Sequence, residues 1–308
     1  MENRNLGASD LVVSVVGLGC NNFGRKLDFE GTREVVDAAL EEGVTFFDTA
    51  DVYGDGESER FLGEILDGRR DQVVLATKFG WQSESGELRG SAEYAKGAID
   101  ASLARLRTDH VDLYYYHRPD GVTPFEETLG ALDEIVSEGK ARYIGCSNLT
   151  AAELREVDDL TKRNGTTPVV ALQNEYSLLQ REAERDVLPL CRELQIGFVP
   201  YFPLASGLLT GKYRRGERPP PGSRLADRPE RLTDERFRVV AELERFADEH
   251  GHTLLELSIG ALVSTPAVGS VIAGATSAEQ VRINAEAGSW RLSKDELADL
   301  RELLASRE

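Results

Sequence analysis

Short apolar runs alternate with longer amphipathic runs along almost the whole chain. The apolar runs are rich in Val, Ile, Leu, Phe and Tyr and lack regular polar alternation, which is typical of strands covered on both faces. We predict strands over residues 11–19, 44–48, 72–78, 111–117, 141–146, 169–173, 197–201 and 269–273. The amphipathic runs predict helices over 30–42, 91–107 and 124–138, and near 58–67, 151–162, 183–194, 234–250, 253–264, 277–287 and 293–305.

The regular succession of strand and helix predicts a parallel sheet. Eight such units favour an α/β fold closed into a (β/α)8 TIM barrel with additional helices, and we expect residues 1–308 to form one such domain. A doubly wound open sheet would carry a glycine fingerprint on its first strand. Gly17 and Gly19 stand there, but Asn22 replaces the third glycine, and Asp48 lies beyond the spacing of the expected acidic partner.

One long interval interrupts the alternation. The residues from Leu204 to about Asp234 are rich in glycine, proline and arginine. Loops this long inside a compact domain are usually functional or disordered. Because this loop follows the seventh strand of the predicted barrel, we expect a lid or a cofactor clasp rather than a domain linker.

Composition narrows the function classes. The 308 residues include 36 Lys and Arg and 54 Asp and Glu, and the net charge of −18 argues against a nucleic-acid or anionic-membrane surface. No apolar stretch approaches the ~20 residues of a membrane-spanning helix, and the start lacks a signal-peptide core, so we expect a cytoplasmic protein.

Cys20, Cys146 and Cys191 are typical of reduced intracellular thiols. His250 and His252 share a turn with no third ligand in view, so we expect no metal site.

Four polar residues end or follow successive strands of the predicted barrel. Asp48 ends the second strand, Lys78 the third and His117 the fourth, while Tyr53 begins the loop after the second. Because parallel strands end at one rim, we expect these side chains to face one neighbourhood. The set suits proton donation to a carbonyl oxygen that becomes an alkoxide. Since the ordinary tyrosine pKa of about 10 is high for this task, we expect the neighbouring ammonium to lower it.

Each of these residues also has a structural interpretation when it is taken alone. A lysine at a strand end commonly forms a surface salt bridge, and a lone histidine is more often structural than catalytic. Tyr53 could pack within its loop, and Asp48 could cap a turn. Their joint occurrence at successive strand ends favours a catalytic site. A barrel hydrolase or aldolase with a Schiff base on Lys78 is a competing chemistry.

Taken together, the motifs resemble the aldo-keto reductases over nearly the whole chain. The segment DTADVYG is followed by Glu59, which matches the spacing of that family. The resemblance implies a (β/α)8 barrel that reduces aldehydes and ketones with NADPH. The family's catalytic tetrad corresponds to Asp48, Tyr53, Lys78 and His117. In that tetrad the tyrosine is the general acid, the lysine tunes it, the aspartate fixes the lysine, and the histidine polarises the carbonyl.

The resemblance also implies contacts with the cofactor. Ser147 and Asn148, in the segment GCSN, and Gln173 would hydrogen-bond the nicotinamide carboxamide. Tyr201 would stack on the nicotinamide ring. The other cofactor-binding positions are Leu204, Ser206, Leu209, Lys212, Arg224, Gly274, Thr276, Gln280 and Asn284.

The residues after the eighth strand bear on the choice between NADPH and NADH. Many NADPH-preferring members have a lysine and an arginine there, where this chain has Gly274 and Gln280. In this motif the chain resembles a bacterial-type member of the branch that includes potassium-channel β subunits. That resemblance implies that positive charge comes from the long loop, through Lys212 and Arg224. We expect NADPH/NADP as the cofactor, with NADH as the alternative.

Phe23 and Trp81 are the residues that we expect to shape the pocket for a small carbonyl substrate. Arg118, next to His117, could meet an anionic substrate or form a surface salt bridge. A competing function is a cofactor-binding regulatory subunit with little turnover, because potassium-channel β subunits resemble this family and retain its tetrad. The sequence leaves the physiological substrate, the preferred direction and the oligomeric state open.

Overall fold

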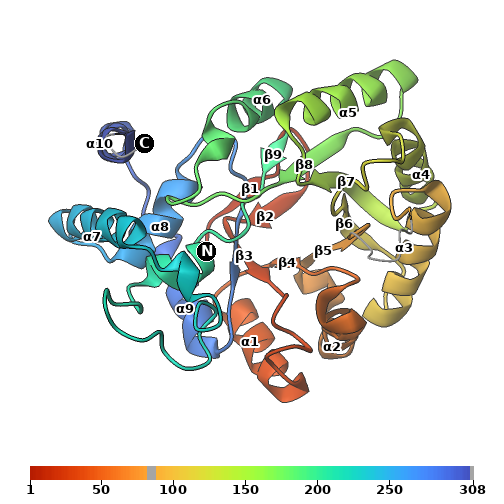
Figure 1. The fold of residues 1–308 in the computed structure, drawn as a ribbon. Helices are drawn as coiled ribbons and strands as arrows, with labels where there is room; N and C mark the ends of the chain where they lie inside the picture. Colours follow the sequence, from red (N-terminus) through yellow and green to blue (C-terminus); the bar gives the residue numbers. More distant parts are fainter. Residues whose placement is uncertain (82–87, 306–308) are drawn as a thin grey trace.

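The computed structural model describes residues 1–81 and 88–305, which form a ring of strands surrounded by helices (Figure 1). The strands are β1 (Asn3–Asn5), β2 (Val12–Ser14), β3 (Val16–Gly19), β4 (Phe46–Asp48), β5 (Val74–Phe79), β6 (Val111–Tyr116), β7 (Ala141–Ser147), β8 (Val169–Gln173), β9 (Gly197–Phe198) and β10 (Val271–Gly274). The α-helices are α1 (Phe29–Glu41), α2 (Glu57–Ile65), α3 (Ala92–Leu106), α4 (Phe125–Ser137), α5 (Ala151–Asn164), α6 (Val187–Leu194), α7 (Asp234–Glu249), α8 (Leu254–Val263), α9 (Ala278–Ala287) and α10 (Lys294–Ala305). Short 3₁₀ helices are η1 (Tyr53–Gly56), η2 (Arg70–Gln72), η3 (Glu182–Glu184), η4 (Ala205–Thr210) and η5 (Pro229–Arg231).

Eight strands form one parallel sheet in the order β10-β3-β4-β5-β6-β7-β8-β9. Backbone hydrogen bonds also join the two end strands of this order. The N–H of Phe198 donates to the carbonyl of Ala267 (2.7 Å), and the N–H of Gly269 donates back to Phe198 (2.8 Å). The N–H of Ile272 donates to the carbonyl of Pro200 (3.1 Å). The prediction of a (β/α)8 barrel is confirmed.

The predicted first strand, residues 11–19, is wrong in one respect, because two strands lie there. β2 pairs antiparallel with β1 in a separate hairpin, whereas β3 belongs to the barrel. The change of partner occurs at Ser14, whose hydroxyl accepts hydrogen bonds from the N–H groups of Thr45 and Phe46 (3.1 and 3.2 Å). The same hydroxyl donates to the carbonyl of Val16 (2.7 Å). A side chain therefore replaces the backbone partners that a continuous strand would use.

Other predicted boundaries shift by a few residues. β4 begins at Phe46 rather than at residue 44, and β9 ends at Phe198 rather than at residue 201. Pro200, which has no N–H to donate, lies just beyond the end of β9. The predicted helix over 183–194 is the short turn η3 followed by α6.

Local signals in the sequence fix the ends of several helices. Thr150 and Thr253 begin α5 and α8 with capping boxes, in which the Thr hydroxyl and a Glu side chain three residues later satisfy backbone N–H groups. Gly165 ends α5 with a φ of 65°, a conformation that suits glycine. These ends set the lengths of the loops at both rims of the barrel.

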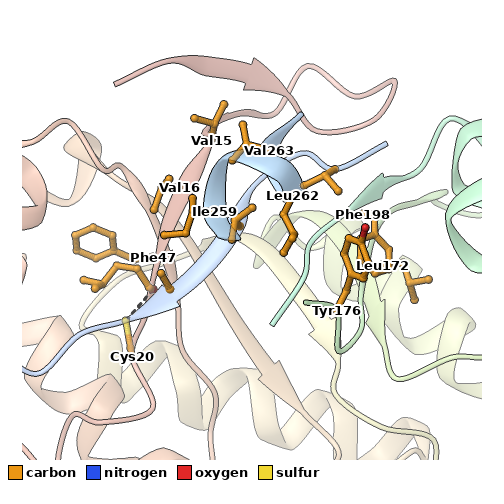
Figure 2. Close-up of a cluster of buried hydrophobic side chains, with 14 of the residues drawn as sticks. Val15, Val16, Cys20, Phe47, Leu172, Tyr176, Phe198, Ile259, Leu262 and Val263 are labelled. Atoms are coloured by element: carbon orange, nitrogen blue, oxygen red, sulfur yellow. Dashed lines mark hydrogen bonds between the residues drawn. The ribbon is translucent and has the colours of Figure 1, made fainter. Parts of the chain in front are cut away.

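Two layers of apolar side chains hold the barrel together. The outer layer lies between the strands and the helices, and Figure 2 shows Ile259 and Leu262 of α8 among the side chains of β3, β8 and β9. The inner cluster fills the barrel and consists of Leu6, Leu11, Val13, Phe46, Ala76, Leu113, Tyr115, Ala171, Val199 and Ile272. The first three come from the β1–β2 hairpin and its turn, so the hairpin packs against the interior of the barrel.

The hairpin closes the barrel by a close approach to β9 and β10. A Cβ atom on Gly197 or Gly269 would lie 2.5 or 2.4 Å from the Leu6 side chain. Only glycine fits at these two positions without displacing Leu6. The opposite rim, where the parallel strands end, is left to the loops and carries the polar residues.

The interval from Leu204 to Asp234 is the long loop that the sequence predicts. Within it the structure has only η4 and η5 before α7 begins. Figure 1 shows this segment as an extended teal loop beside α9. Across residues 1–81 and 88–305, no helix is both long and apolar enough to cross a membrane.

Candidate active site

The carboxyl-terminal ends of the parallel strands carry the polar residues that the sequence singles out. Asp48 ends β4, Lys78 lies in β5, and His117 directly follows β6. Ser147 ends β7 and pairs in register with Gln173, which ends β8. All of these except Lys78 line one cavity of about 1560 Å³. The structure therefore brings residues from distant segments to a single site.

Lys78 and Asp48 form a buried ion pair at the base of this cavity. The Lys78 Nζ donates to Asp48 Oδ2 (2.6 Å) and to the carbonyl of Thr49 (2.7 Å), and the lysine side chain is fully buried. The second oxygen of Asp48 accepts a hydrogen bond from Gln173 Nε2 (2.9 Å). Burial alone would lower the pKa of Lys78, but the Asp48 carboxylate and Tyr53 raise it above its usual 10.5. Lys78 is therefore a fixed positive charge.

Tyr53 lies above this ion pair. The Lys78 Nζ is 5.1 Å from the centroid of the Tyr53 ring. Burial raises the pKa of Tyr53 above 10.0, and the charge of Lys78 and its hydrogen bond oppose that rise. The ammonium acts in the expected direction, but burial is the larger effect, so the pKa of Tyr53 stays above its usual value. Tyr53 consequently keeps its proton near neutral pH.

His117 is the fourth residue of the predicted tetrad, and its ring contacts that of Tyr53. Its ring lies edge-on to that of Tyr53, with 6.0 Å between the centroids, and 4.6 Å from the ring of Trp81. Burial first, and then the charges of Lys78 and Arg118, hold its pKa well below 6.5. The imidazole is thus neutral at pH 7. Its Nδ1 has no hydrogen-bond partner among the described residues.

These four side chains can act together on one carbonyl oxygen. Tyr53 offers a proton, His117 offers a neutral N–H, and the charge of Lys78 favours negative charge nearby.

The three cysteines are free and buried, and burial raises the pKa of Cys146 and of Cys191 to about 12. Thiolate chemistry is therefore disfavoured. Within residues 1–81 and 88–305, no cluster of side chains suits a metal ion.

A chain of hydrogen bonds links the predicted nicotinamide contacts. The Tyr201 hydroxyl donates to Asn148 Oδ1 (2.7 Å), and Asn148 Nδ2 donates to Ser147 Oγ (3.0 Å) and to the carbonyl of His117 (2.9 Å). Ser147 Oγ in turn donates to the carbonyl of Gln173 (2.7 Å). Because the Gln173 amide also binds Asp48, this chain connects the aromatic wall of the cavity with the buried ion pair.

Most of the remaining predicted site residues also face the cavity. The lining includes Trp81, Leu204, Ser206, Lys212, Arg224, Gly274, Thr276, Gln280 and Asn284. Phe23 and Leu209 are fully buried and lie outside this lining. Phe23 therefore does not line the cavity itself, and its role in supporting the pocket stays a prediction, as does the contact of Leu209 with the cofactor. Gln280 Oε1 accepts from the N–H of Thr276 (2.9 Å), which orders the segment before α9.

The cavity is also lined by Asn21, Asn22 and Phe202, which were not predicted from the sequence as site residues. Arg224 Nη2 approaches Asn21 Oδ1 (3.3 Å) and Asn22 Oδ1 (3.4 Å), and its guanidinium lies 5.3 Å from the centroid of Phe202. The side-chain amide of Asn22 also donates to the carbonyl of Ala275 (3.1 Å). The pair of asparagines after the first barrel strand was a usable signal, because polar residues there must reach the rim.

Asp51 is a further residue near the site that was not predicted from the sequence. Its backbone N–H donates to the carbonyl of Lys78 (3.1 Å), while its Oδ1 is buried without a partner in the described part of the chain. Burial, and then the charge of Glu59, raise the pKa of Asp51 to about 7, and Arg105 opposes them. A carboxylate beside the Lys78 strand is thus neutral until the pH approaches 7.

Asp51→Asn should make stability less sensitive to pH. The neutral acid stabilises the fold fully below about pH 4, and this contribution is lost as the pH rises through about 7. Between pH 5 and pH 8 the original chain should lose about 1–2 kcal/mol more unfolding free energy than the variant, after a discount for the partial exposure of Asp51. Urea unfolding at the two pH values measures this difference, and Asp71→Asn, on an exposed side chain, is the matched control. An equal response of both variants would contradict the explanation.

The chain is similar to known proteins over most of its length. Residues 15–305 match the Aldo/keto reductase family. The chain is 37% identical over 300 residues to a probable voltage-gated potassium channel subunit beta from Arabidopsis thaliana, covering 93% of this chain and 91% of that protein. A protein of the same description from Oryza sativa subsp. japonica is 36% identical, with the same coverage. Probable aldo-keto reductase 1 from Glycine max is 34% identical over 307 residues, covering 96% of this chain and 86% of that protein.

Proposed function

This chain belongs to the aldo/keto reductase family of oxidoreductases, and we propose that it reduces aldehydes and ketones to alcohols by reversible hydride transfer from NADPH. The observation that carries the proposal is the buried Lys78–Asp48 ion pair beneath Tyr53, with neutral His117 facing the same cavity. The arrangement matches what carbonyl reduction requires: an acid, a fixed positive charge beside it, and a second hydrogen-bond donor.

The residues around the cavity fit a nicotinamide dinucleotide, which the family generally uses. Ser147, Asn148 and Tyr201 offer polar groups beside the tetrad. At the other end, Arg224 is half-buried, stacks on Phe202 and has no carboxylate partner within the described residues. A guanidinium that is held by two long hydrogen bonds to asparagines and pairs with no carboxylate suits a phosphate group, which favours NADPH over NADH. When bound, the cofactor supplies the hydride for the carbonyl carbon.

In this mechanism the side chains of the protein donate and accept the proton. Tyr53 donates its phenolic proton to the carbonyl oxygen as negative charge develops there. Lys78 stabilises the tyrosinate that remains, and Asp48 holds the ammonium in place. His117 donates a ring N–H to the same oxygen. In the reverse direction, the tyrosinate accepts the proton of the alcohol.

Of the two competing functions, Schiff-base chemistry is disfavoured and the regulatory subunit is retained. A Schiff base on Lys78 requires a neutral amine, but this lysine is fully buried, ion-paired and has a raised pKa. A cofactor-binding regulatory subunit with little turnover is supported by the similarity to two probable potassium channel β subunits. We retain it as the second candidate. We also propose that residues 1–308 form one domain, located in the cytoplasm, which acts on small carbonyl compounds.

The test is a spectrophotometric panel with the purified protein. NADPH and NADH are each combined with aromatic aldehydes, dicarbonyls, pyridoxal and aldoses, and loss of the reduced nicotinamide is followed. We expect NADPH-dependent turnover that scales with protein concentration. Tight NADPH binding without turnover of any carbonyl would favour the regulatory candidate instead.

Arg224→Ala should weaken NADPH binding far more than NADH binding. If the guanidinium meets the additional phosphate of NADPH, its loss removes a charge-assisted contact and should raise the Kd for NADPH by about tenfold to a hundredfold. Titration of the two cofactors by fluorescence measures both constants. Arg245→Ala, on the exposed side of α7, is the charge-matched control. Equal weakening of the two cofactors would exclude the phosphate contact.

A further inference from the structure

Arg118 is a cationic residue of the cavity that the proposed reaction leaves without a role. It directly follows His117, lines the cavity and is half-buried. Its Nε is buried without a hydrogen-bond partner, and the guanidinium forms no ion pair with any described residue. Among the described residues, the surface salt bridge considered from the sequence is therefore not formed. A half-buried guanidinium that keeps unused donors is suited to an anionic ligand.

The guanidinium of Arg118 lies close to the reacting group. It stands 5.3 Å from the centroid of the Trp81 ring, which in turn is 4.6 Å from the centroid of His117. Trp81 is therefore a neighbour of both the charge and the imidazole. The field of Arg118 reaches the reaction site, because it contributes to lowering the pKa of His117 and opposes the rise at Tyr201. A ligand at His117 that extends along Trp81 would meet this charge.

The loop that carries Arg118 is held in place by several hydrogen bonds. Pro119 restricts the backbone of the residue before it. The N–H of Asp120 donates to the Tyr116 hydroxyl (3.0 Å), and the Asp120 carboxylate accepts from Gly90, Val122 and Thr123. The backbone at Arg118 is thus held before any ligand arrives, and its guanidinium rests against Trp81. A preset cation binds an anion at a lower entropic cost than a mobile one.

The charges that line the cavity favour the same kind of ligand. The other cationic lining residues are Arg25, Lys26, Lys212, Arg224 and Arg228. The acidic lining residues are fewer: Asp55, Glu175 and Asp48, the last of which is paired with Lys78. A positive cavity in a chain with a net charge of −18 is a local feature that the composition does not explain.

We propose that Arg118 binds a carboxylate on the carbonyl substrate, so that the preferred substrates are aldehydes that carry a carboxylate. This inference rests on the proposed function and names its substrate class. One guanidinium matches a singly charged carboxylate through two parallel hydrogen bonds. The face of Trp81 would cover the apolar part of the substrate between its two ends. Arg118 is in this sense a specificity-determining residue.

The kinetic test compares para-carboxybenzaldehyde with its methyl ester, which has the same reacting group but no charge. Arg118→Met should lower kcat/KM for the acid by about tenfold or more and for the ester by less than about threefold. Arg118→Lys should retain part of the preference, because it keeps the charge but loses the paired donors. Arg245→Met is the control for a general loss of positive charge. An equal loss for acid and ester in Arg118→Met would overturn the proposal.

A second measurement separates this proposal from the proposed function. Calorimetry with benzoate and with benzamide, both in the presence of NADP, reports recognition of the carboxylate without turnover. We expect the original chain to prefer benzoate and Arg118→Met to lose that preference. If benzoate binds no better than benzamide, the Arg118 proposal fails even in an active reductase. If neither aldehyde is reduced while benzoate is still preferred, the proposed function fails and the anion site stands.

Discussion

Tyr53→Phe should lower carbonyl turnover by about 10²–10⁴-fold, the range in which a positioned general acid contributes to a reaction rate. The substitution removes one hydroxyl and keeps the aromatic ring beside His117 and Lys78. Cofactor affinity should stay close to that of the original chain, since the nicotinamide contacts that we propose lie on β7, on β8 and after β9. Steady-state kinetics with one aldehyde and a fluorescence titration with NADPH measure the two effects separately.

The matched control is Tyr143→Phe, in the amino-terminal half of β7 and away from the rim. It removes the same hydroxyl from the same residue type, and kcat/KM should stay within about threefold of the original value because no reacting group is touched. If Tyr53→Phe keeps more than about a tenth of the original kcat/KM, another group donates the proton and the role of Tyr53 is wrong. A large loss of NADPH binding in the same variant would show that the ring itself had moved.

Lys78→Met should be the most destabilising of the substitutions considered. It leaves the Asp48 carboxylate buried without its cation, and breaking a buried ion pair in this way costs about 3–5 kcal/mol. The double variant Asp48→Asn/Lys78→Met removes both charges and can keep the hydrogen bond from Gln173 to the side-chain oxygen. We therefore expect the double variant to be more stable than the single one, although both lack activity. Equilibrium unfolding in urea provides the free energies.

Lys96→Met is the control for this experiment. Lys96 pairs with Glu134 on the surface, and its side chain is 41% exposed. Because solvent screens exposed pairs, that substitution should cost no more than about 1 kcal/mol. If the single and double variants at Asp48 and Lys78 lose the same stability, the unpaired buried charge is not the cause of the loss.

The barrel could be predicted from the sequence because its strands are buried on both faces and read as unbroken apolar runs. β1 could not, because Asn3, Arg4 and Asn5 are polar and nothing local marks them as a strand. The split at Ser14 depends on the N–H groups of Thr45 and Phe46, which lie far along the chain. Long-range partners of this kind leave no trace in a local pattern.

The candidate site shows the same limit in another form. The rule that parallel strands end at one rim was enough to bring Asp48, Lys78 and His117 together. The direction of the Tyr53 pKa was not accessible, because it depends on how deeply the phenol is buried. No sequence motif singles out Asp51, and only the structure shows that its side chain is largely buried with an oxygen that has no partner among the described residues. Likewise, the sequence could not tell whether Phe23 lines a wall or lies behind it.

The β1–β2 hairpin has a consequence for the order of events during biosynthesis. Its turn binds the carbonyl of Gln195 through Ala8, and Arg4 donates to the carbonyls of Val263 and Val268 (3.0 and 3.1 Å). The hairpin therefore makes these contacts with segments that are synthesised much later than the hairpin itself. Contacts of such long separation form slowly, because loop entropy is lost before they can stabilise the fold. Packing of the hairpin against the barrel is accordingly a late step of folding, because it requires that the chain as far as Val268 has been synthesised.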